Sequence, residues 1–249
     1  MLSQLDLIFL LAAFVVGLSK GGLASAGSLA APFLALWVDP LRAAALLLPI
    51  FIVSDMAALW MFRRDFSRPN VAVLLPAALL GVVVATLAAP HVSVAFTTLL
   101  CGGIGIASVA QAAVRALRRG GTQARPFDAP RGAFWGVLVG ITSYISHSGA
   151  PPFQSFVLPQ RLPNLQFAGT AVLVFAGVNL SKLPAYWAAG VMEIPSLRLL
   201  AMMGAVAIAG TMVGRQVTKR LSPESYMRIV QALLLVVSVQ LVWKGLAEL

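Results

Sequence analysis

Residues 142–152 read TSYISHSGAPP and interrupt an apolar run that extends from Arg131 to Pro159. A second apolar run, from Leu5 to Trp37, is interrupted by SKGG at 19–22 and again by SAGS at 25–28. Each half of these two regions is about 10–16 residues long, whereas a membrane-spanning helix needs roughly 20. Non-helical backbone is tolerated at membrane depth only where it is buried in protein or lines a wet cavity. The two breaks therefore predict half-helices or re-entrant hairpins.

The composition indicates that the chain lies in a membrane. Of its 249 residues, 59% are hydrophobic and only 10% are charged, and the mean hydropathy is +0.91. An ordinary soluble domain has about 25% charged residues, so soluble nucleic-acid-binding domains, disordered chains and secreted disulfide scaffolds are excluded. The net charge of +10 lies in short loops between apolar runs, as in the cytoplasmic loops of membrane proteins. Cys101 is the only cysteine, so no intrachain disulfide can form.

The apolar runs follow an order that occurs twice. Six of them are long enough to span a membrane: 41–62, 70–89, 92–117, 163–189, 195–216 and 223–246. One broken region (5–37 or 131–159) and three spans make up each repeat, 1–117 and 131–249, with a polar linker at 118–130. A shift of 123 residues places Gly17 on Gly140, Pro40 on Pro163 and Gly81 on Gly204. We therefore expect a duplicated architecture.

Loop charges orient the two repeats. Three basic loops are assigned to the cytoplasm: Arg63, Arg64 and Arg68; Arg115, Arg118, Arg119, Arg125 and Arg131; and Arg215, Lys219, Arg220 and Arg228. The connections at His91 and Glu193 have few basic residues and are assigned outside, as are both termini. Each broken region then begins and ends on one side, and the repeats are inverted. The alternative, in which each broken region crosses once, gives eight spans and conflicts with the loop charges.

The expected fold class is thus an all-α polytopic membrane protein with two inverted repeats, each a broken or re-entrant helical hairpin followed by three transmembrane helices. These features resemble the sulfite exporter TauE/SafE family of membrane permeases. The resemblance rests on the glycine-rich first break (Gly17, Gly21, Gly22, Gly27), the small-residue run to Pro32, the pair Gly214-Arg215 and the duplicated layout. The second break, SHSGAPP at 146–152, is poorer in glycine than the family pattern. The resemblance implies secondary transport, in the direction of export, of small sulfur-containing anions such as sulfite or organosulfonates across the cell (inner or plasma) membrane.

Small and polar residues at the breaks are candidates for anion binding. A helix that begins at a break presents unpaired N–H groups and the positive end of its dipole, and hydroxyls add donors. The alternative is that small residues allow close helix packing. The residues selected are Ser19, Gly21, Gly22, Ser25, Ser28, Thr142, Ser143, Ser146, Ser148 and Gly149.

Ionisable groups within apolar runs are functional candidates because they are costly in a membrane. Lys20 at the first break could neutralise an anion, and Lys182, near Asn179, could do so as a gate residue; both could instead snorkel to the interface. Asp55 could pair with a lysine or carry a proton.

His147 and Gln154 complete the set of candidates at the second break. His147 lies between serines, where it could bind the substrate, carry a coupled proton or be purely structural. Gln154 would face the same cavity if a half-helix begins just before it.

Other functions remain as alternatives. A carrier of another carboxylate or of a cation is one, although a cation carrier would want more carboxylates than Asp55 in its spans. An intramembrane enzyme using Ser146 or Ser148 with His147 is another, but no nucleophile-elbow motif supports it. We expect no enzyme activity, cofactor, metal site or nucleic-acid partner. The expected partners are a small anion and the lipid bilayer, and a homodimer is compatible with the sequence.

Overall fold

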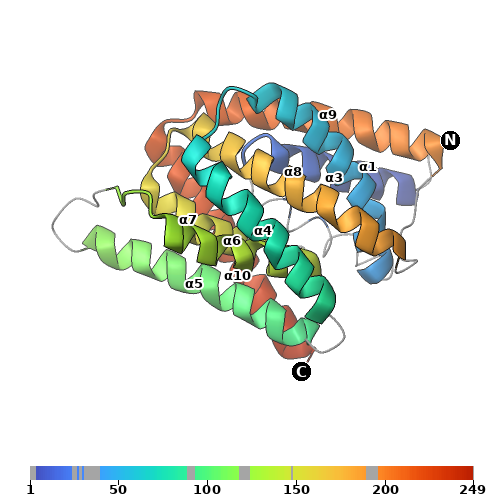
Figure 1. Ribbon diagram of the computed structural model, residues 1–249. Helices are drawn as coiled ribbons and strands as arrows, with labels where there is room; N and C mark the ends of the chain where they lie inside the picture. Colours follow the sequence, from blue (N-terminus) through green and yellow to red (C-terminus); the bar gives the residue numbers. More distant parts are fainter. Residues whose placement is uncertain are drawn as a thin grey trace. The chain divides into compact units, whose positions relative to one another are not determined.

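The computed structural model describes residues 4–23, 27, 30, 40–88, 93–117, 124–146, 148–188 and 196–248. Within these ranges the chain is helical and has no strand (Figure 1), so the all-α prediction is confirmed there. The elements are α1 (Gln4–Lys20), α3 (Pro40–Phe62), α4 (Arg68–Ala88), α5 (Val94–Leu117), α6 (Ala129–Ser146), α7 (Ala150–Val157), the 3-10 helix η3 (Leu158–Gln160), α8 (Asn164–Ala188), α9 (Leu197–Arg220) and α10 (Pro223–Ala247).

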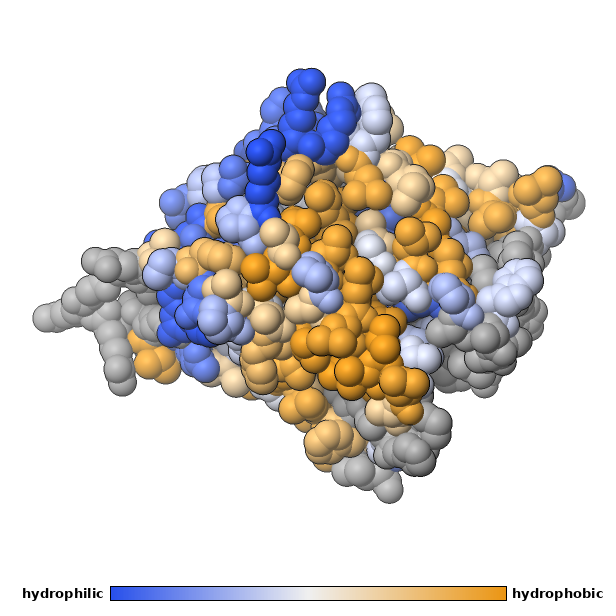
Figure 2. Space-filling view, viewed as in Figure 1, coloured by the Kyte–Doolittle hydropathy of each residue, from blue (hydrophilic) through white to orange (hydrophobic). Residues whose placement is uncertain are grey.

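Several helices have the length and composition of membrane spans. In the described ranges, four segments are apolar and long enough to cross a bilayer: Arg68–Ala88, Asn164–Pro184, Leu197–Arg220 and Pro223–Ala247. Shorter apolar helical segments are Leu46–Phe62 and Thr98–Val114. On α4, Leu80, Val83 and Leu87 are more than half exposed, and Figure 2 shows apolar surface over this helix. An apolar outer face of this kind would be unfavourable in water and suits contact with lipid.

The helices form two compact units, and each unit contains helices from both sequence repeats. Unit 1 consists of residues 1–67 and 164–222, with α1, α3, α8 and α9. Unit 2 consists of residues 68–163 and 223–249, with α4 to α7, η3 and α10.

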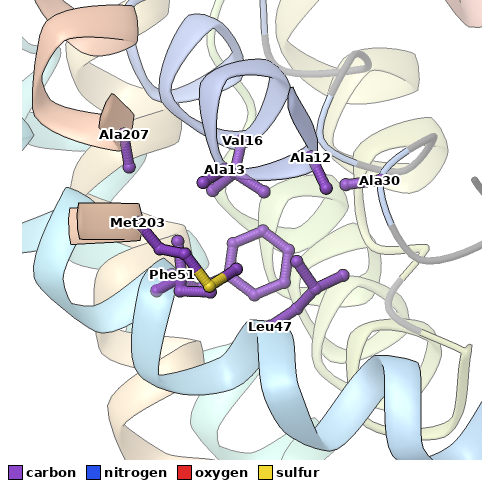
Figure 3. Close-up of a cluster of buried hydrophobic side chains, with 9 residues drawn as sticks. Ala12, Ala13, Val16, Ala30, Leu47, Phe51, Met203 and Ala207 are labelled. Carbon is purple, nitrogen blue, oxygen red and sulfur yellow. The ribbon is translucent and has the colours of Figure 1, made fainter. Parts of the chain in front are cut away.

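The core of unit 1 joins α1, α3 and α9. Its α1 side chains are small, whereas α3 and Met203 of α9 contribute larger ones, and Figure 3 shows Met203 extending toward the Phe51 ring, with Ala12, Ala13 and Val16 of α1 above it. The buried residues are Ala12, Ala13, Val16, Ala30, Leu47, Ile50, Phe51, Met203 and Ala207. Small residues on α1 allow the helices to approach closely.

Helix directions in unit 1 follow from glycine contacts. Gly210 of α9 lies against Phe14 of α1, and Gly214, one turn later, lies against Leu18, so α1 and α9 are parallel. Gly204 contacts Val53 of α3, and further along both helices Arg215 reaches Asp65, just beyond α3. Because α3 is also parallel to α9, α1 and α3 run in the same direction.

α8 runs the other way. Gly169 lies against the backbone of Asp65, whereas Asn179, later in α8, bonds to Asp55, earlier in the chain. α3 and α8 are therefore antiparallel.

In unit 2, the second broken region folds back on itself. Gly136 and then Gly140 of α6 lie against Leu74 and then Ala78 of α4, so these two helices are parallel. After the break, α7 returns along α6, because Phe156 contacts Gly132 near the start of α6.

The two ends of this folded-back region lie side by side. The Arg125 N–H donates to the Pro159 carbonyl at 2.9 Å, and the rings of Phe127 and Phe156 meet edge to face with centroids 6.3 Å apart. The reciprocal side-chain amide bonds of Asn70 and Gln160, 2.9 and 3.0 Å long, fasten the returning chain to the start of α4.

The same helix crossing is built once in each unit. A Cβ atom on Gly17 of α1 would overlap the carbonyl oxygen of Ala207 in α9, and one on Gly140 of α6 would overlap that of Ala78 in α4. Only glycine lets the two backbones touch in this way. Gly17 and Gly140 are the pair that the sequence shift of 123 residues equates.

The contacts made by the other helix of each crossing, α9 and α4, correct the alignment of the two sequence repeats. Gly210 lies against Phe14, and Gly81 lies correspondingly against Val137. Gly81 is therefore matched by Gly210, a shift of 129 residues, and not by Gly204 as the sequence comparison had it. The difference arises because α9 begins at residue 197, six residues later than residue 191, where the shift of 123 would place the start of α4.

Candidate functional site

An ion pair is buried inside unit 1. The Lys20 Nζ lies 2.6 Å from Asp55 Oδ1, and the two side chains are only 8% and 1% exposed. The same ammonium lies 5.2 Å from the centre of the Phe51 ring, which is close enough for a cation–π contact. Of the sequence alternatives for Asp55, pairing with a lysine is therefore what the structure contains.

Two residues of α8 extend this ion pair. The Asn179 side-chain amide donates to Asp55 Oδ2 at 2.8 Å, and the Lys182 Nζ donates to Asn179 Oδ1 over a longer 3.5 Å. Lys182 is 1% exposed, so neither lysine snorkels to the surface of the unit. We call Lys20, Asp55, Asn179 and Lys182 the charge cluster.

The sequence accounts for this meeting of side chains. Asn179 and Lys182 are three residues apart on α8 and share one helix face, which α8 presents to Asp55 of the antiparallel α3. Lys20 stands in the last turn of α1, where a cation complements the helix dipole. Its long side chain leans back toward the start of α1, as helical side chains do, and so reaches Phe51 and Asp55.

The charge cluster contains two lysines and one carboxylate, and both oxygens of Asp55 are engaged, by Lys20 and by Asn179. Ionisable groups are costly to bury unless they are paired and hydrogen-bonded. Two lysines buried in one cluster are suited to contacting a negatively charged ligand.

The described start of the first break, residues 19–23, contributes packing rather than backbone donors. The N–H groups of Gly21 and Gly22 donate to Gly17 O and Ser19 O at 2.9 and 3.2 Å, which completes the C-terminus of α1. Gly22 has φ +132°, a conformation that favours glycine, and faces Thr218. The carbonyl of Gly21 accepts from Thr218 Oγ1 at 3.1 Å. The first break thus begins at the C-terminus of α1, which is the negative end of the helix dipole. The positive charge at this position comes from the Lys20 side chain.

Serine residues at the first break are only partly described. Ser19 is buried, and Gly27 packs against its hydroxyl oxygen. Ser25 and Ser28 lie outside the described residues.

The second break, in unit 2, lies between the end of α6 at Ser146 and the start of α7 at Ala150, with Gly149 as N-cap. The Ser148 N–H donates to Thr142 O at 3.2 Å. Pro151 and Pro152 have no N–H, so α7 offers fewer unpaired donors at its start than an ordinary helix. Thr142, Ser143, Ser148 and Gln154 are all buried. His147 and the side chain of Ser146 lie outside the described part of the chain.

Phe51 is the member of this site that the sequence analysis did not select. It precedes Asp55 by four residues and therefore shares its face of α3, so helical spacing alone could have found it. An aromatic residue one turn from a carboxylate within an apolar helix is common, however, and only the position of Lys20 gives Phe51 a role.

One comparison with known proteins bears on the whole chain. The family model described as Sulfite exporter TauE/SafE matches residues 9–241. No curated protein and no solved structure matches the chain at a significant level. The family match spans α1 to α10 and includes both breaks, the charge cluster and Gly214-Arg215. The resemblance seen in the sequence is confirmed, and this multi-pass membrane protein belongs to the sulfite exporter TauE/SafE family of transporters.

Proposed function

We propose that the protein is a secondary transporter that exports small sulfur-containing anions, such as sulfite or organosulfonates, across the cell (inner or plasma) membrane. The charge cluster of unit 1 binds the anion. The observation that carries the proposal is the burial of two lysines, Lys20 and Lys182, in one cluster inside unit 1. Family membership supports the class of substrate.

The depth of the charge cluster supports this role. Ten residues of α8 separate Asn179, which contacts Asp55, from Gly169, which lies against Asp65. At 1.5 Å per residue this is about 15 Å, or half of the roughly 30 Å hydrocarbon core of a bilayer. If the end of unit 1 that carries Asp65 and Arg215 lies at the membrane surface, the cluster lies near the midplane, where transporters hold their substrates.

Helix directions support inverted repeats. α3 and α8 occupy the same place in the two sequence repeats and are antiparallel in unit 1. α5 and α10 are likewise equivalent, and they are antiparallel in unit 2, because Gly102 contacts Ser238 whereas Leu99 contacts Gly245. Equivalent helices of opposite direction are what inverted repeats require, and this architecture allows a site to open to either side in turn.

The test compares Lys182→Met with Lys219→Met in proteoliposomes. Lys219 is an exposed lysine near the end of α9, so its substitution removes the same charge from a position where solvent screens it. We expect Lys182→Met to weaken sulfite and methanesulfonate binding by about tenfold or more, as the loss of a buried charge-assisted contact does. Lys219→Met should have little effect. Acetate serves as the competing carboxylate.

Two outcomes would contradict the proposal. One is anion transport by the Lys182→Met protein at the unaltered rate and affinity, with folding verified by its melting temperature. The other is transport of acetate by the unaltered protein in preference to every sulfur-containing anion, which would favour a carboxylate carrier.

A further inference from the structure

The end of unit 1 at which α3 and α9 stop carries concentrated positive charge. Residues 60–67 and 214–222 contain one acidic side chain, Asp65, which pairs with Arg215. The other basic side chains of these two stretches are all exposed: Arg63, Arg64, Lys219 and Arg220. Figure 2 shows strongly hydrophilic surface at the end of α3. We call these four residues the basic end of unit 1.

We propose that the basic end of unit 1 binds the phosphate group of an anionic phospholipid. The inference goes beyond the proposed function, because it concerns the lipid around the protein and not the anion that is transported. Basic residues placed just beyond the apolar part of a membrane helix attract anionic headgroups. In unit 1 both α3 and α9 place basic residues in this position.

Arg63 is held against the face of Trp60 in the last turn of α3. Its Nη1 donates to the Trp60 carbonyl at 2.6 Å, and its Cζ lies 4.6 Å from the centre of the indole ring, within the range of a cation–π contact. Trp60 is itself 67% exposed. Because tryptophan prefers the depth at which acyl chains meet headgroups, this contact places the guanidinium beside the lipid phosphates.

The Arg63 guanidinium has donors to spare. A guanidinium carries five N–H donors in a planar fork, which can contact two phosphate oxygens at once. One donor is used on the Trp60 carbonyl, and no other acceptor for Arg63 is found among the side chains and backbone groups that the structure describes. A side chain that is already held in place loses less conformational entropy when a ligand binds. Arg63 therefore combines a fixed position with unused donors.

Exposed apolar side chains adjoin the basic end, which favours a phospholipid over a soluble anion. On α3, Met56 and Trp60 are at least half exposed and share one helix face with Arg63. On α9, the last two turns before the basic residues expose Met212, Val213 and Val217. Acyl chains can lie along these side chains while the phosphate group contacts the arginines. A soluble anion would use only the charged part of this surface.

The experiment measures lipid contact at Trp60 by fluorescence quenching. A full-length chain keeps Trp60 as its only tryptophan when it carries Trp37→Phe, Trp135→Phe, Trp187→Phe and Trp243→Phe. This chain is titrated in neutral detergent with phosphatidylglycerol or phosphatidylcholine of identical brominated acyl chains, because bromine quenches only a nearby indole. The measured quantity is the mole fraction of lipid at half-maximal quenching.

We expect phosphatidylglycerol to quench Trp60 at a mole fraction at least about fivefold lower than phosphatidylcholine does. Arg63→Gln should reduce this preference about fivefold, which is the usual effect of one basic group near an anionic membrane surface. Arg198→Gln is the matched control, because Arg198 is exposed at the opposite end of α9. It removes the same charge and should leave the preference unchanged.

Three outcomes would overturn the inference. The first is equal quenching by the two lipids, or an unchanged preference in Arg63→Gln and Arg64→Gln proteins that melt at the temperature of their parent. The second is an equal loss of preference in Arg198→Gln, which would mean that net charge and not the basic end attracts the lipid. The third is displacement of phosphatidylglycerol by soluble glycerol phosphate beyond that caused by sodium chloride at equal ionic strength, which would make a free anion the ligand.

Discussion

Asp65 and Arg215 are 150 residues apart in the sequence, and they form an ion pair of 3.1 Å that ties the segment after α3 to α9. The Arg215 guanidinium also lies over the Phe62 ring, 5.4 Å from its centre. Two basic segments that the charge pattern assigned to the same side of the membrane are therefore in direct contact within unit 1, although Arg215 lies within α9 and not in a loop. This ion pair joins the two chain segments of unit 1, residues 1–67 and 164–222, at the end of the unit that carries their basic residues.

The contribution of the Asp65–Arg215 ion pair to stability can be measured by a double-mutant cycle. Both side chains are about one-third exposed, so we expect a coupling energy between Asp65→Asn and Arg215→Met of only about 0.5–1 kcal/mol. Unfolding in a graded series of denaturing detergent gives the four free energies. Arg220→Met, an exposed change on the same helix, is the control and should show no coupling to Asp65→Asn. A coupling of zero would mean that the ion pair contributes nothing to stability.

The buried pair should behave differently from the exposed one. Lys20→Met leaves the Asp55 carboxylate without its counter-ion in the interior, and breaking a buried pair in this way costs about 3–5 kcal/mol. Lys20→Met combined with Asp55→Asn removes both charges and should recover most of the lost stability. The same detergent-unfolding assay reports both values. A double variant less stable than Lys20→Met alone would contradict this account of the pair.

The crossing that occurs in both units should be intolerant of side chains. We expect Gly17→Ala and Gly140→Ala each to destabilise the protein by about 1–3 kcal/mol, because the added Cβ meets a carbonyl of the neighbouring helix. Gly103→Ala is the matched control, since a Cβ at that helical position meets nothing within 4 Å. Its substitution should be neutral or slightly stabilising, given the higher helix propensity of alanine. Equal effects at all three glycines would show that helix propensity, rather than close contact, governs them.

The predicted topology can be tested with single cysteines. Cys101 is buried, and Cys101→Ala provides a background without thiols. Ala129→Cys, at the start of α6, and Ala247→Cys, at the end of α10, are exposed positions. With inverted repeats, a membrane-impermeant maleimide added to intact cells should label Ala247→Cys, and Ala129→Cys only after permeabilisation. Labelling of both from the same side would favour the eight-span alternative.

Much of the charge cluster could be predicted because charged groups in apolar helices are conspicuous. Lys20, Asp55 and Lys182 were candidates on this ground alone, and Asn179 was noted beside Lys182. The pairing between them could not be predicted, because Asp55 and Asn179 are 124 residues apart and their meeting depends on the antiparallel packing of α3 and α8.

Where the structure describes them, the breaks lie at the predicted positions, but their hydrogen bonding differs from the prediction. Gly21 and Gly22 satisfy their N–H groups within the last turn of α1, and the prolines of α7 remove donors that a general argument about helix termini assumes. There, local chemistry rather than the pattern of apolar runs decides the outcome. The repeat register failed at Gly81 for a different reason, since a uniform shift cannot represent the six residues by which α9 begins later than the shifted α4.

The division of each unit between two distant chain segments has a consequence for biosynthesis. α1 and α3 leave the ribosome early, and Lys20 and Asp55 can neutralise each other as soon as both helices are inserted. The partners of α1 in α9 are made more than a hundred residues later. Neither sequence repeat can form a complete unit by itself. In the nascent protein, the glycine face of α1 therefore has no helix to pack against until α9 has been synthesised. A ribosome that stalls in the linker at 118–130 would leave a membrane intermediate in which α1 lacks its packing partner α9.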